Sequence, residues 1–278
     1  MLSNSAAGYR YNITAGVEKK MKGYSGYLGY TYGMSKDISS TVRSSPAANY
    51  EWNQAIRGNN PDLAYSNFDL RHKIVAAQSY QQNWGNNNTV GISFLYRGRS
   101  GTPFSFIYQG DINRDGSSRN DLIYVPANQE EIQLVDITDN DGTVLVTADE
   151  QWNELDNYIG NSEYLASRRG NYVERNGGRT PWNHELDMKL QYSKGLKNGN
   201  KLHVSLDVLN VLNLINKNWG TLVYVPNVVN SSYSLLKYIG IEDNQPQYQF
   251  NIQDGETPWV TDLYNSRWRA QLGLRLEF

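Results

Sequence analysis

The sequence contains no cysteine, which excludes disulfide bonds, thiol catalysis and cysteine-bound metals. It also has no unbroken apolar run near the roughly 18 residues that a membrane-spanning helix needs. The mean hydropathy of −0.65 likewise argues against a helical membrane protein. A membrane β-barrel remains compatible with this low value, because only every second residue of a barrel strand faces lipid.

Signatures of catalysis and of nucleic-acid binding are missing as well. The three histidines, His72, His184 and His203, lack the spacing of metal ligands, and no GxSxG, HExxH or phosphate-binding loop occurs. Glu185 and Asp187 could form an acid/base pair in a cleft, but inward polar residues are the default in a water-filled barrel. The net charge of −2 gives no sign of nucleic-acid binding. We therefore expect neither an enzyme nor a nucleic-acid-binding protein.

The first eight residues, Met1–Gly8, lack the basic start and apolar core of a secretory signal peptide. If the chain forms an outer-membrane barrel, as the strand pattern described below predicts, it has to be exported. The missing signal peptide then needs an explanation. We expect the chain to be the C-terminal part of a longer precursor.

Amphipathic aromatic residues are abundant, with 21 tyrosines and 7 tryptophans against 6 phenylalanines. Their rings have an apolar body and a polar atom, so they prefer the interface between membrane and water. Together with the low hydropathy, this composition favours an outer-membrane barrel over a helical membrane protein.

The segment Arg267–Phe278 alternates strictly between apolar and polar residues. Successive residues of a strand point to opposite faces, so one face of this strand is wholly apolar and the other wholly polar. Lipid on one side and water on the other would produce this pattern. The alternative is a half-buried antiparallel strand of a soluble sandwich.

Seven segments share this alternation, and each is close to the roughly 9–11 residues of a tilted spanning strand. They are residues 9–19, 23–35, 69–82, 89–100, 184–193, 201–213 and 267–278.

The connections between these segments favour the barrel. Short connections at 20–23, 83–88 and 194–200 alternate with long ones at 36–68, 101–183 and 216–266. Outer-membrane barrels have short periplasmic turns and long extracellular loops, whereas a soluble sandwich has no reason to gather its long loops at one end. We therefore predict an all-β, antiparallel transmembrane barrel in the outer membrane of a Gram-negative cell, with a periplasmic C-terminus. Seven strands would leave an open edge in lipid, so we expect further strands to complete the barrel.

Four segments, in this order, resemble the C-terminal barrel region of TonB-dependent outer-membrane transporters of Bacteroidetes type. They are Gly110–Pro126, Arg179–Leu190, Val208–Asn213 and Ser266–Phe278. The similarity spans most of the chain and is closest to Oar-like receptors, which carry an N-terminal carboxypeptidase-regulatory-like domain. It implies a barrel of about 22 strands with a plugged lumen, of which these strands would be the last seven.

The resemblance also implies partners. Energy coupling would run through TonB, by way of a plug domain and a TonB box that lie N-terminal to this region. The apolar stripe that ends the chain resembles the signal read by the barrel-assembly machinery; it consists of Leu272, Leu274, Leu276 and Phe278. Outer-membrane lipid and a surface lipoprotein, or other subunits of an outer-membrane complex, are the remaining expected partners.

Oxygen-bearing side chains at alternate positions, followed by a glycine, resemble the start of a calcium loop. They are Asp111, Asn113 and Asp115, with Gly116 after them and Asp121 further on. The twelfth position is Leu122 rather than a bidentate glutamate, so Asp121 would have to close a looser Ca²⁺ site. The alternative is an Asx-rich turn, and no other cofactor is expected. Residues 136–142 favour a second turn, in a hairpin between 132–135 and 143–147.

Two further groups of residues lie in the long loops. Arg168, Arg169, Arg175 and Arg179 could steer anionic ligands, but pairing with Glu163, Glu174 and Glu185 is the favoured interpretation. Aromatic residues could stack on a sugar or peptide, although most should pack inside the loops. They are Tyr50, Trp52, Trp152, Tyr158, Tyr164, Trp219 and Trp259.

Two functions fit these features. The first is uptake of a large nutrient (a peptide, glycan or chelate) by a TonB-dependent receptor whose loops capture the ligand. The second is a structural scaffold whose loops bind partner proteins or surface lipoproteins. A plug domain and TonB box upstream would favour the first; their absence would favour the second.

Overall fold

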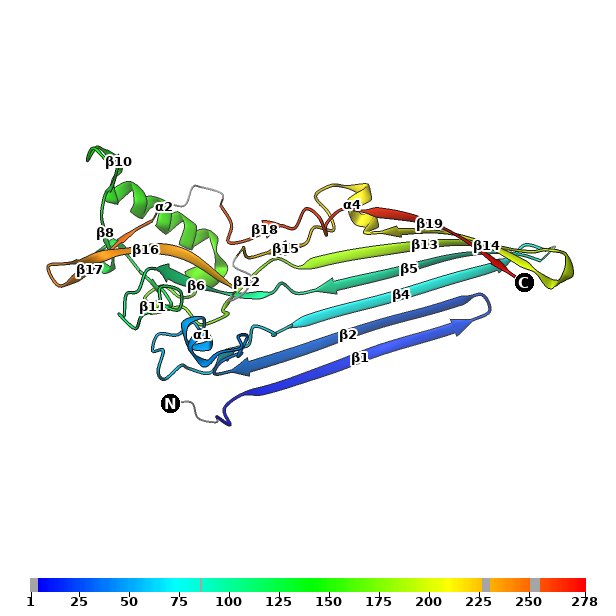
Figure 1. Ribbon diagram of the computed structural model, residues 1–278, viewed down its shortest axis with the longest axis horizontal. Helices are drawn as coiled ribbons and strands as arrows, with labels where there is room; N and C mark the ends of the chain where they lie inside the picture. Colours follow the sequence, from blue (N-terminus) through cyan, green and yellow to red (C-terminus); the bar gives the residue numbers. More distant parts are fainter. Residues whose placement is uncertain (1–4, 86, 227–230, 251–255) are drawn as a thin grey trace.

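The chain forms a long curved sheet with a compact module at one end (Figure 1). The computed structural model describes residues 5–85, 87–226, 231–250 and 256–278. The expected loop 216–266 contains residues 227–230 and 251–255, which lie outside the described residues. None of the described helices is long and apolar enough to cross a membrane.

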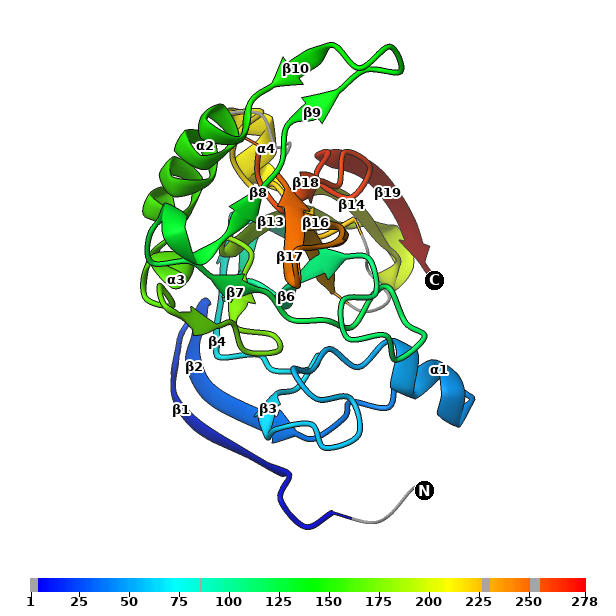
Figure 2. The ribbon, with the colours of Figure 1, turned by 90° about the vertical axis from the view of Figure 1, so that its left-hand side faces the viewer.

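Seven long strands build the main sheet, and each pairs antiparallel with its neighbour in the order β1-β2-β4-β5-β13-β14-β19. Their bounds are β1 Tyr9–Met21, β2 Tyr24–Asp37, β4 His72–Asn83, β5 Asn88–Arg99, β13 Asn183–Gly195, β14 Lys201–Leu209 and β19 Arg269–Glu277. The view along the strands shows that the sheet is curved and that β1 and β19 are its edges (Figure 2).

The turn between β1 and β2 shows how closely the strands approach. Gly23 has a φ of +75°, a conformation that residues other than glycine rarely adopt. A Cβ at this position would lie 2.5 Å from the carbonyl oxygen of Gln81 on β4. Glycine is therefore required both by the turn and by the neighbouring strand.

The expected strand 201–213 is too long at its C-terminal end. β14 ends at Leu209, and residues Val211–Ile215 form helix α4 instead. The cause is Asn210, whose φ of 54° turns the chain out of the strand. Its side-chain amide donates to the carbonyl oxygens of Gly220 (2.8 Å) and Ser266 (2.7 Å), so Asn210 ties together both ends of the following loop.

The expected strand 69–82 begins three residues later, at His72. Residues 66–69 form a turn in which the Asp69 amide donates to the Ser66 carbonyl oxygen at 3.0 Å. The expected all-β class also needs correction: the long loops contain helices, so the chain is mostly β. The strand alternation gave no information about these loop helices.

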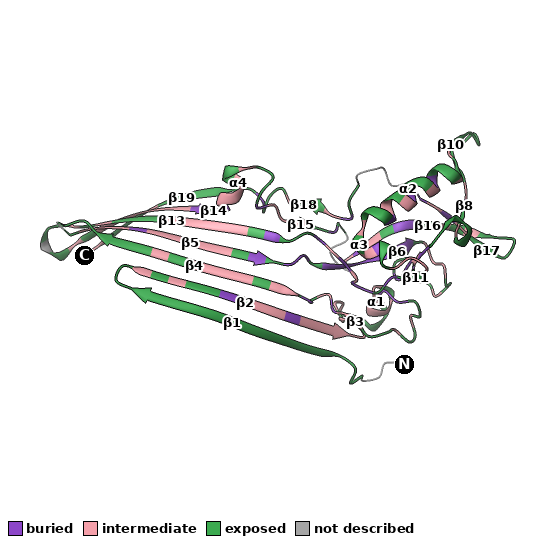
Figure 3. Cartoon of the chain, turned by 180° about the vertical axis from the view of Figure 1, so that it is seen from behind, coloured by how far each residue is buried: buried purple, intermediate pink, exposed green. Residues whose placement is uncertain are grey.

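The register places most of the apolar residues of the seven strands on one face. Leu190 lies opposite Ile92 on one side and Leu206 on the other, and Leu206 in turn lies opposite Leu272. This face is uncovered: among the described residues of the seven strands, Val208 is the only buried apolar side chain. Figure 3 shows these strands mostly in the colours of exposed and intermediate residues. An apolar surface of this extent indicates a membrane or partner contact.

The buried core lies in the compact module, called here the loop module, which the described residues of 101–182 and 216–266 form. A five-stranded sheet in the order β12-β6-β16-β17-β8 is its centre, with parallel pairing of β16 to β6 and of β17 to β8. The bounds are β6 Pro103–Gln109, β8 Gln133–Leu134, β12 Gly178–Arg179, β16 Ser232–Glu242 and β17 Gln245–Gln249. β6 is an apolar run buried on both faces, as expected for a strand in parallel pairing.

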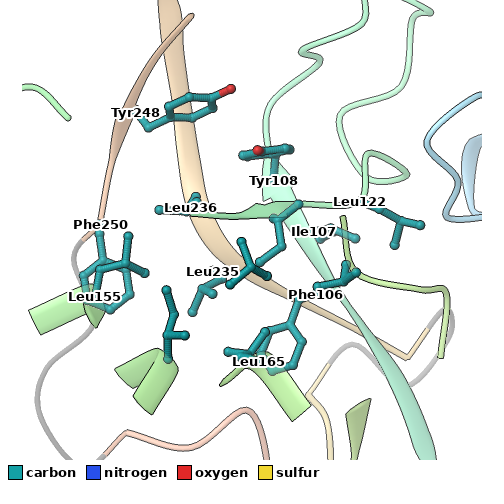
Figure 4. Packing of buried hydrophobic residues seen from close by; sticks show 14 of the residues in the cluster. Phe106, Ile107, Tyr108, Leu122, Leu155, Leu165, Leu235, Leu236, Tyr248 and Phe250 are labelled. Atoms are coloured by element: carbon teal, nitrogen blue, oxygen red, sulfur yellow. The ribbon is translucent and has the colours of Figure 1, made fainter. Parts of the chain in front are cut away.

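Helices α2 (Ala148–Asn161) and α3 (Glu163–Ala166) cover this sheet. A capping box between Thr147 and Glu150 begins α2, and Leu155 and Ile159, one turn apart, are buried in the core. Figure 4 shows Leu155 beside Phe250, and Phe106 beside Leu165. The long loops therefore have a hydrophobic core of their own.

The remaining elements are short. They are α1 Pro46–Glu51, β3 Ala64–Tyr65, β7 Tyr124–Val125, η1 Gln129–Glu131, β9 Ile137–Thr138, β10 Val144–Val146, β11 Asn171–Tyr172, η2 Lys197–Gly199, β15 Val223–Tyr224 and β18 Val260–Thr261.

The expected hairpin around residues 136–142 exists, but its first arm is β9 rather than residues 132–135. Within that segment Leu134 pairs with Tyr248 in the central sheet. The Asp139 side chain closes the turn by accepting the amides of Asp141 (2.9 Å) and Thr143 (2.8 Å).

Candidate functional site

A row of aromatic rings crosses the apolar face where the sheet meets the loop module. The Trp182 ring lies between His72 and His184, with ring centres 5.7 and 5.9 Å apart. The Tyr30 hydroxyl bonds to Nδ1 of His72 (2.8 Å), and the Tyr96 hydroxyl to Nδ1 of His184 (2.7 Å). Amphipathic rings at the edge of an apolar band are typical of a membrane–water boundary.

The opposite face of the sheet carries paired charges. Arg97 contacts both Glu185 (2.8 Å) and Asp187 (2.7 Å), and Lys189 contacts Asp207 (2.9 Å). Two cavities, of about 390 and 280 Å³, open on this face. Because Arg97 holds both carboxylates, the pair considered above as an acid/base couple is part of a salt-bridge ladder on a polar wall.

The C-terminal stripe lies on the apolar face, with one residue in every second position of β19 and Phe278 following the strand. Its exposed fractions are 76% for Leu272, 75% for Leu274, 46% for Leu276 and 91% for Phe278. This geometry leaves the stripe accessible. Its reading by the assembly machinery stays a prediction.

Two arginines, Arg175 buried and Arg179 partly buried, join the loop module to the sheet. Arg175 is 3% exposed, pairs with Asp37 at the end of β2 (2.7 Å) and donates to Asn53 (3.0 Å). Burial lowers the pKa of Arg175, and the neighbouring Asp37 charge opposes that shift. Arg179 pairs with Asp69 in the same junction.

The expected pairing of the four loop arginines is therefore only partly right. Arg168 contacts Glu174 at 3.4 Å, as expected, but Arg169 contacts Asp156 at 2.6 Å. Glu185 pairs with Arg97 across the sheet instead. Tertiary packing brings Asp37 and Asp69 to the arginines, and the sequence neighbours could not reveal this.

The aspartate-rich loop is held by its own hydrogen bonds. Asp111 accepts the amides of Asp115 (3.0 Å) and Gly116 (2.9 Å), Asn113 accepts that of Asp115 (2.9 Å), and Asp121 accepts that of Ile112 (3.0 Å). Within the described parts of the chain, no group of three His, Asp or Glu side chains is arranged to hold a metal ion. Ca²⁺ binding by Asp111, Asn113, Asp115 and Asp121 stays the untested alternative to the Asx-rich turn.

Asp121 is the most perturbed carboxyl of this loop. It is 3% exposed, and burial raises its pKa to about 6, with the Asp115 and Asp111 charges acting in the same direction. Asp121 borders a cavity of about 570 Å³ in the loop module, which Tyr108 and Tyr248 also line.

A cavity of about 770 Å³ opens in the loop module between α2, α3 and residues 256–259. Three of the seven loop aromatics named above line it: Tyr158, Tyr164 and Trp259. Its walls come from segments about 100 residues apart in sequence. The sequence alone therefore did not predict which residues line this cavity.

The other four loop aromatics have different positions. Trp52 lies between Arg43 and Arg119, each 4.6 Å from its ring, and Tyr50 donates to Asp115 (3.2 Å). Trp152 packs against the core, while Trp219 is 53% exposed.

A family model described as an outer membrane beta barrel domain matches residues 2–233. The matched region includes six of the seven long strands and most of the loop module. No curated protein and no solved structure matches the chain.

Proposed function

Because the chain belongs to the outer membrane beta barrel domain family and is an outer-membrane protein, we propose that it is the barrel portion of a receptor that takes up a large nutrient, such as a peptide, glycan or chelate. The observation that carries this proposal is that the two ends of the main sheet differ. Turns of two to five residues occupy one end of the sheet, and the long connections at the other end fold into a module with its own core and open cavities. A receptor needs such a capture surface above a passage.

The polar face of the sheet is suited to line a water-filled passage through the barrel. Its charges are paired across strands, as between Lys189 and Asp207, and it is suited to contact with water and with a plug domain. In this orientation the loop module is extracellular and Phe278 is periplasmic. Arg97 occupies both nearby carboxylates, so we assign transport without catalysis.

We propose further that uptake is coupled to TonB and that the protein is an Oar-like receptor of a Bacteroidetes species. These proposals rest on the similarity of the four sequence segments named above. The free edges of β1 and β19 support a larger barrel, of about 22 strands by that similarity, because lipid leaves no partner for unpaired backbone groups.

Uptake in intact cells tests the proposal. Cells with and without the native protein are given fluorescent peptides and glycans of increasing size, with and without a protonophore. We expect accumulation that requires both the protein and the proton gradient. Accumulation that is equal in all four conditions would refute energised uptake.

A scaffold role is the second candidate, favoured by the β9–β10 hairpin. This hairpin projects from the loop module (Figure 2), and Val144 and Leu145 on it are 46% and 61% exposed. Exposed apolar residues on a projecting hairpin fit a partner protein such as a surface lipoprotein. Intact mass of the native, membrane-extracted complex separates the two functions: a chain with a plug domain supports transport, and stoichiometric partner subunits without a plug support the scaffold.

A further inference from the structure

The 770 Å³ cavity of the loop module has one polar wall built by a helix. Glu154, Asn157, Tyr158 and Asn161 of α2 follow each other at helical spacing and line the cavity, while Leu155 and Ile159 face the core. Asn161 donates to Asn157 at 3.2 Å, so the two amides form a continuous polar strip. The wall presents hydrogen-bonding groups along its whole length.

The charge of this cavity is one-sided. Glu154, Glu163 and Glu256 line it, and none of them forms a salt bridge within the described part of the chain. Arg179 is the only basic residue of the described lining, and it is already paired with Asp69. The cavity therefore holds three exposed carboxylates without a matching cation.

Aromatic rings form the remaining walls. Trp259 packs edge-on against Phe104, Phe104 against Phe106, and Phe106 is stacked with Tyr164, at ring-centre distances of 6.4, 5.0 and 6.3 Å. Burial raises the pKa of Tyr164 to about 12, so its hydroxyl stays neutral. The rings therefore add apolar and π surface without adding charge.

Two adjacent glycines fix the shape of this aromatic wall, called below the aromatic floor of the cavity. A Cβ on Gly177 would lie 1.9 Å from the Tyr164 hydroxyl oxygen, and one on Gly178 would lie 2.7 Å from the Phe104 ring. Larger residues at either position would displace the rings. The aromatic floor thus depends on a backbone segment, residues 177–178, that is remote in sequence from α2.

We propose that this cavity is the ligand-recognition site of the receptor and that it binds a cationic peptide, with a lysine or arginine side chain set between the glutamates and the aromatic floor. The assignment of this site to nutrient capture rests on the proposed uptake function. Carboxylates attract a cation from a distance, and the faces of Trp259, Tyr158 and Tyr164 interact favourably with it at contact. The Asn157–Asn161 strip supplies donors and acceptors for a peptide backbone.

Other ligand classes fit less well. An anionic chelate would be repelled by three unpaired glutamates. A neutral glycan could stack on the rings, but it would leave the carboxylates uncompensated and would bind independently of ionic strength. Charge therefore distinguishes the peptide from both.

Equilibrium binding to the full-length, detergent-extracted protein tests the proposal. Three fluorescent tripeptides with a central tryptophan serve as probes, flanked by lysine, glutamine or glutamate on both sides. We expect the lysine peptide to bind at least about tenfold more tightly than the glutamine peptide, the glutamate peptide to bind weakest, and added salt to weaken the lysine peptide.

The matched variants are Glu154→Gln/Glu163→Gln/Glu256→Gln, which removes charge at three exposed positions, and Asp149→Asn on the same helix outside the cavity. We expect the triple variant to lose the preference for lysine and Asp149→Asn to keep it. Equal binding of the lysine and glutamine peptides, or an unchanged preference in the triple variant, would overturn the proposal. Binding in detergent needs no energy source, so specific binding without uptake would refute only the transport function.

Discussion

A substitution at residue 274 tests whether the apolar face of β19 contacts lipid. Leu274 lies on the apolar face, and Gln271 on the polar face opposite Asp207. Leu274→Arg places a charge in the bilayer at a cost of about 2–4 kcal/mol near the midplane, so we expect strongly reduced insertion. Gln271→Arg is the control and should insert normally, because it faces water and an acidic neighbour. Equal membrane levels of the two variants, measured by fractionation, would argue against a lipid-facing stripe.

Asp121 gives the loop module a pH dependence. Its pKa in the folded protein is about 6, above the ordinary value of 3.8, so protonation favours the folded loop. Its stabilising contribution is full below about pH 4 and is lost as pH rises through about 6; the total is roughly 3 kcal/mol. We expect the protection of the amides of residues 111–126, measured relative to the intrinsic exchange rate at each pH, to fall across this interval in the wild type. Asp121→Asn should flatten the profile, and a variant with an unchanged profile would assign the dependence to another group.

Calcium tests the same loop independently. Main-chain amides already occupy oxygens of Asp111 and Asp121, so we expect millimolar CaCl₂ to leave the exchange profile of residues 111–126 unchanged relative to EGTA. A bound ion would place positive charge beside Asp121, lower its pKa and remove the acid-side protection. Such a calcium-dependent change would establish the metal site instead of the Asx turn.

At the scale of elements, strand periodicity identified the spanning segments because every second residue of each strand meets the same surroundings. The errors lie at strand ends. Asn210 ends β14 and Asp69 delays β4, in both cases through hydrogen bonds to distant residues such as Ser266 and Ser35. The loop elements were missed for a related reason: β6 pairs in parallel with β16, more than 120 residues later in the chain.

Arg175 is the element-scale link between β2 and the loop module. Arg175→Ala removes the partner of Asp37 and a bond to Asn53, and we expect the junction to lose about 2–4 kcal/mol, because breaking a buried pair leaves a charge uncompensated. Limited proteolysis should then cut residues 36–68 and 101–183 faster. Arg168→Ala is the control, since Arg168 contacts Glu174 and the Tyr172 carbonyl oxygen within the loop module and not the sheet; its partly exposed ion pair should contribute about 0–1 kcal/mol. Equal protease sensitivity of the two variants would contradict the anchoring role.

At the scale of the whole molecule, β1 and β19 each pair on one side only within residues 5–85, 87–226, 231–250 and 256–278. In the outer membrane the outward amides of β1 and β19 need partners, because each unpaired group in lipid costs several kcal/mol. We expect the amides of Tyr9–Met21 in native membranes to exchange as slowly as those of β2. Fast exchange along β1 alone would contradict a completed barrel.

The sequence by itself determined the two-faced strands, the alternation of short and long connections and the outer-membrane assignment, because these depend on local periodicity and on what each face of a strand meets. Only the tertiary structure decided which charges pair, as with Arg175 and Asp37, and how Glu154, Tyr164 and Trp259 come to line one cavity. Those contacts join residues up to 138 positions apart, and no local pattern encodes which distant segment will pack against which.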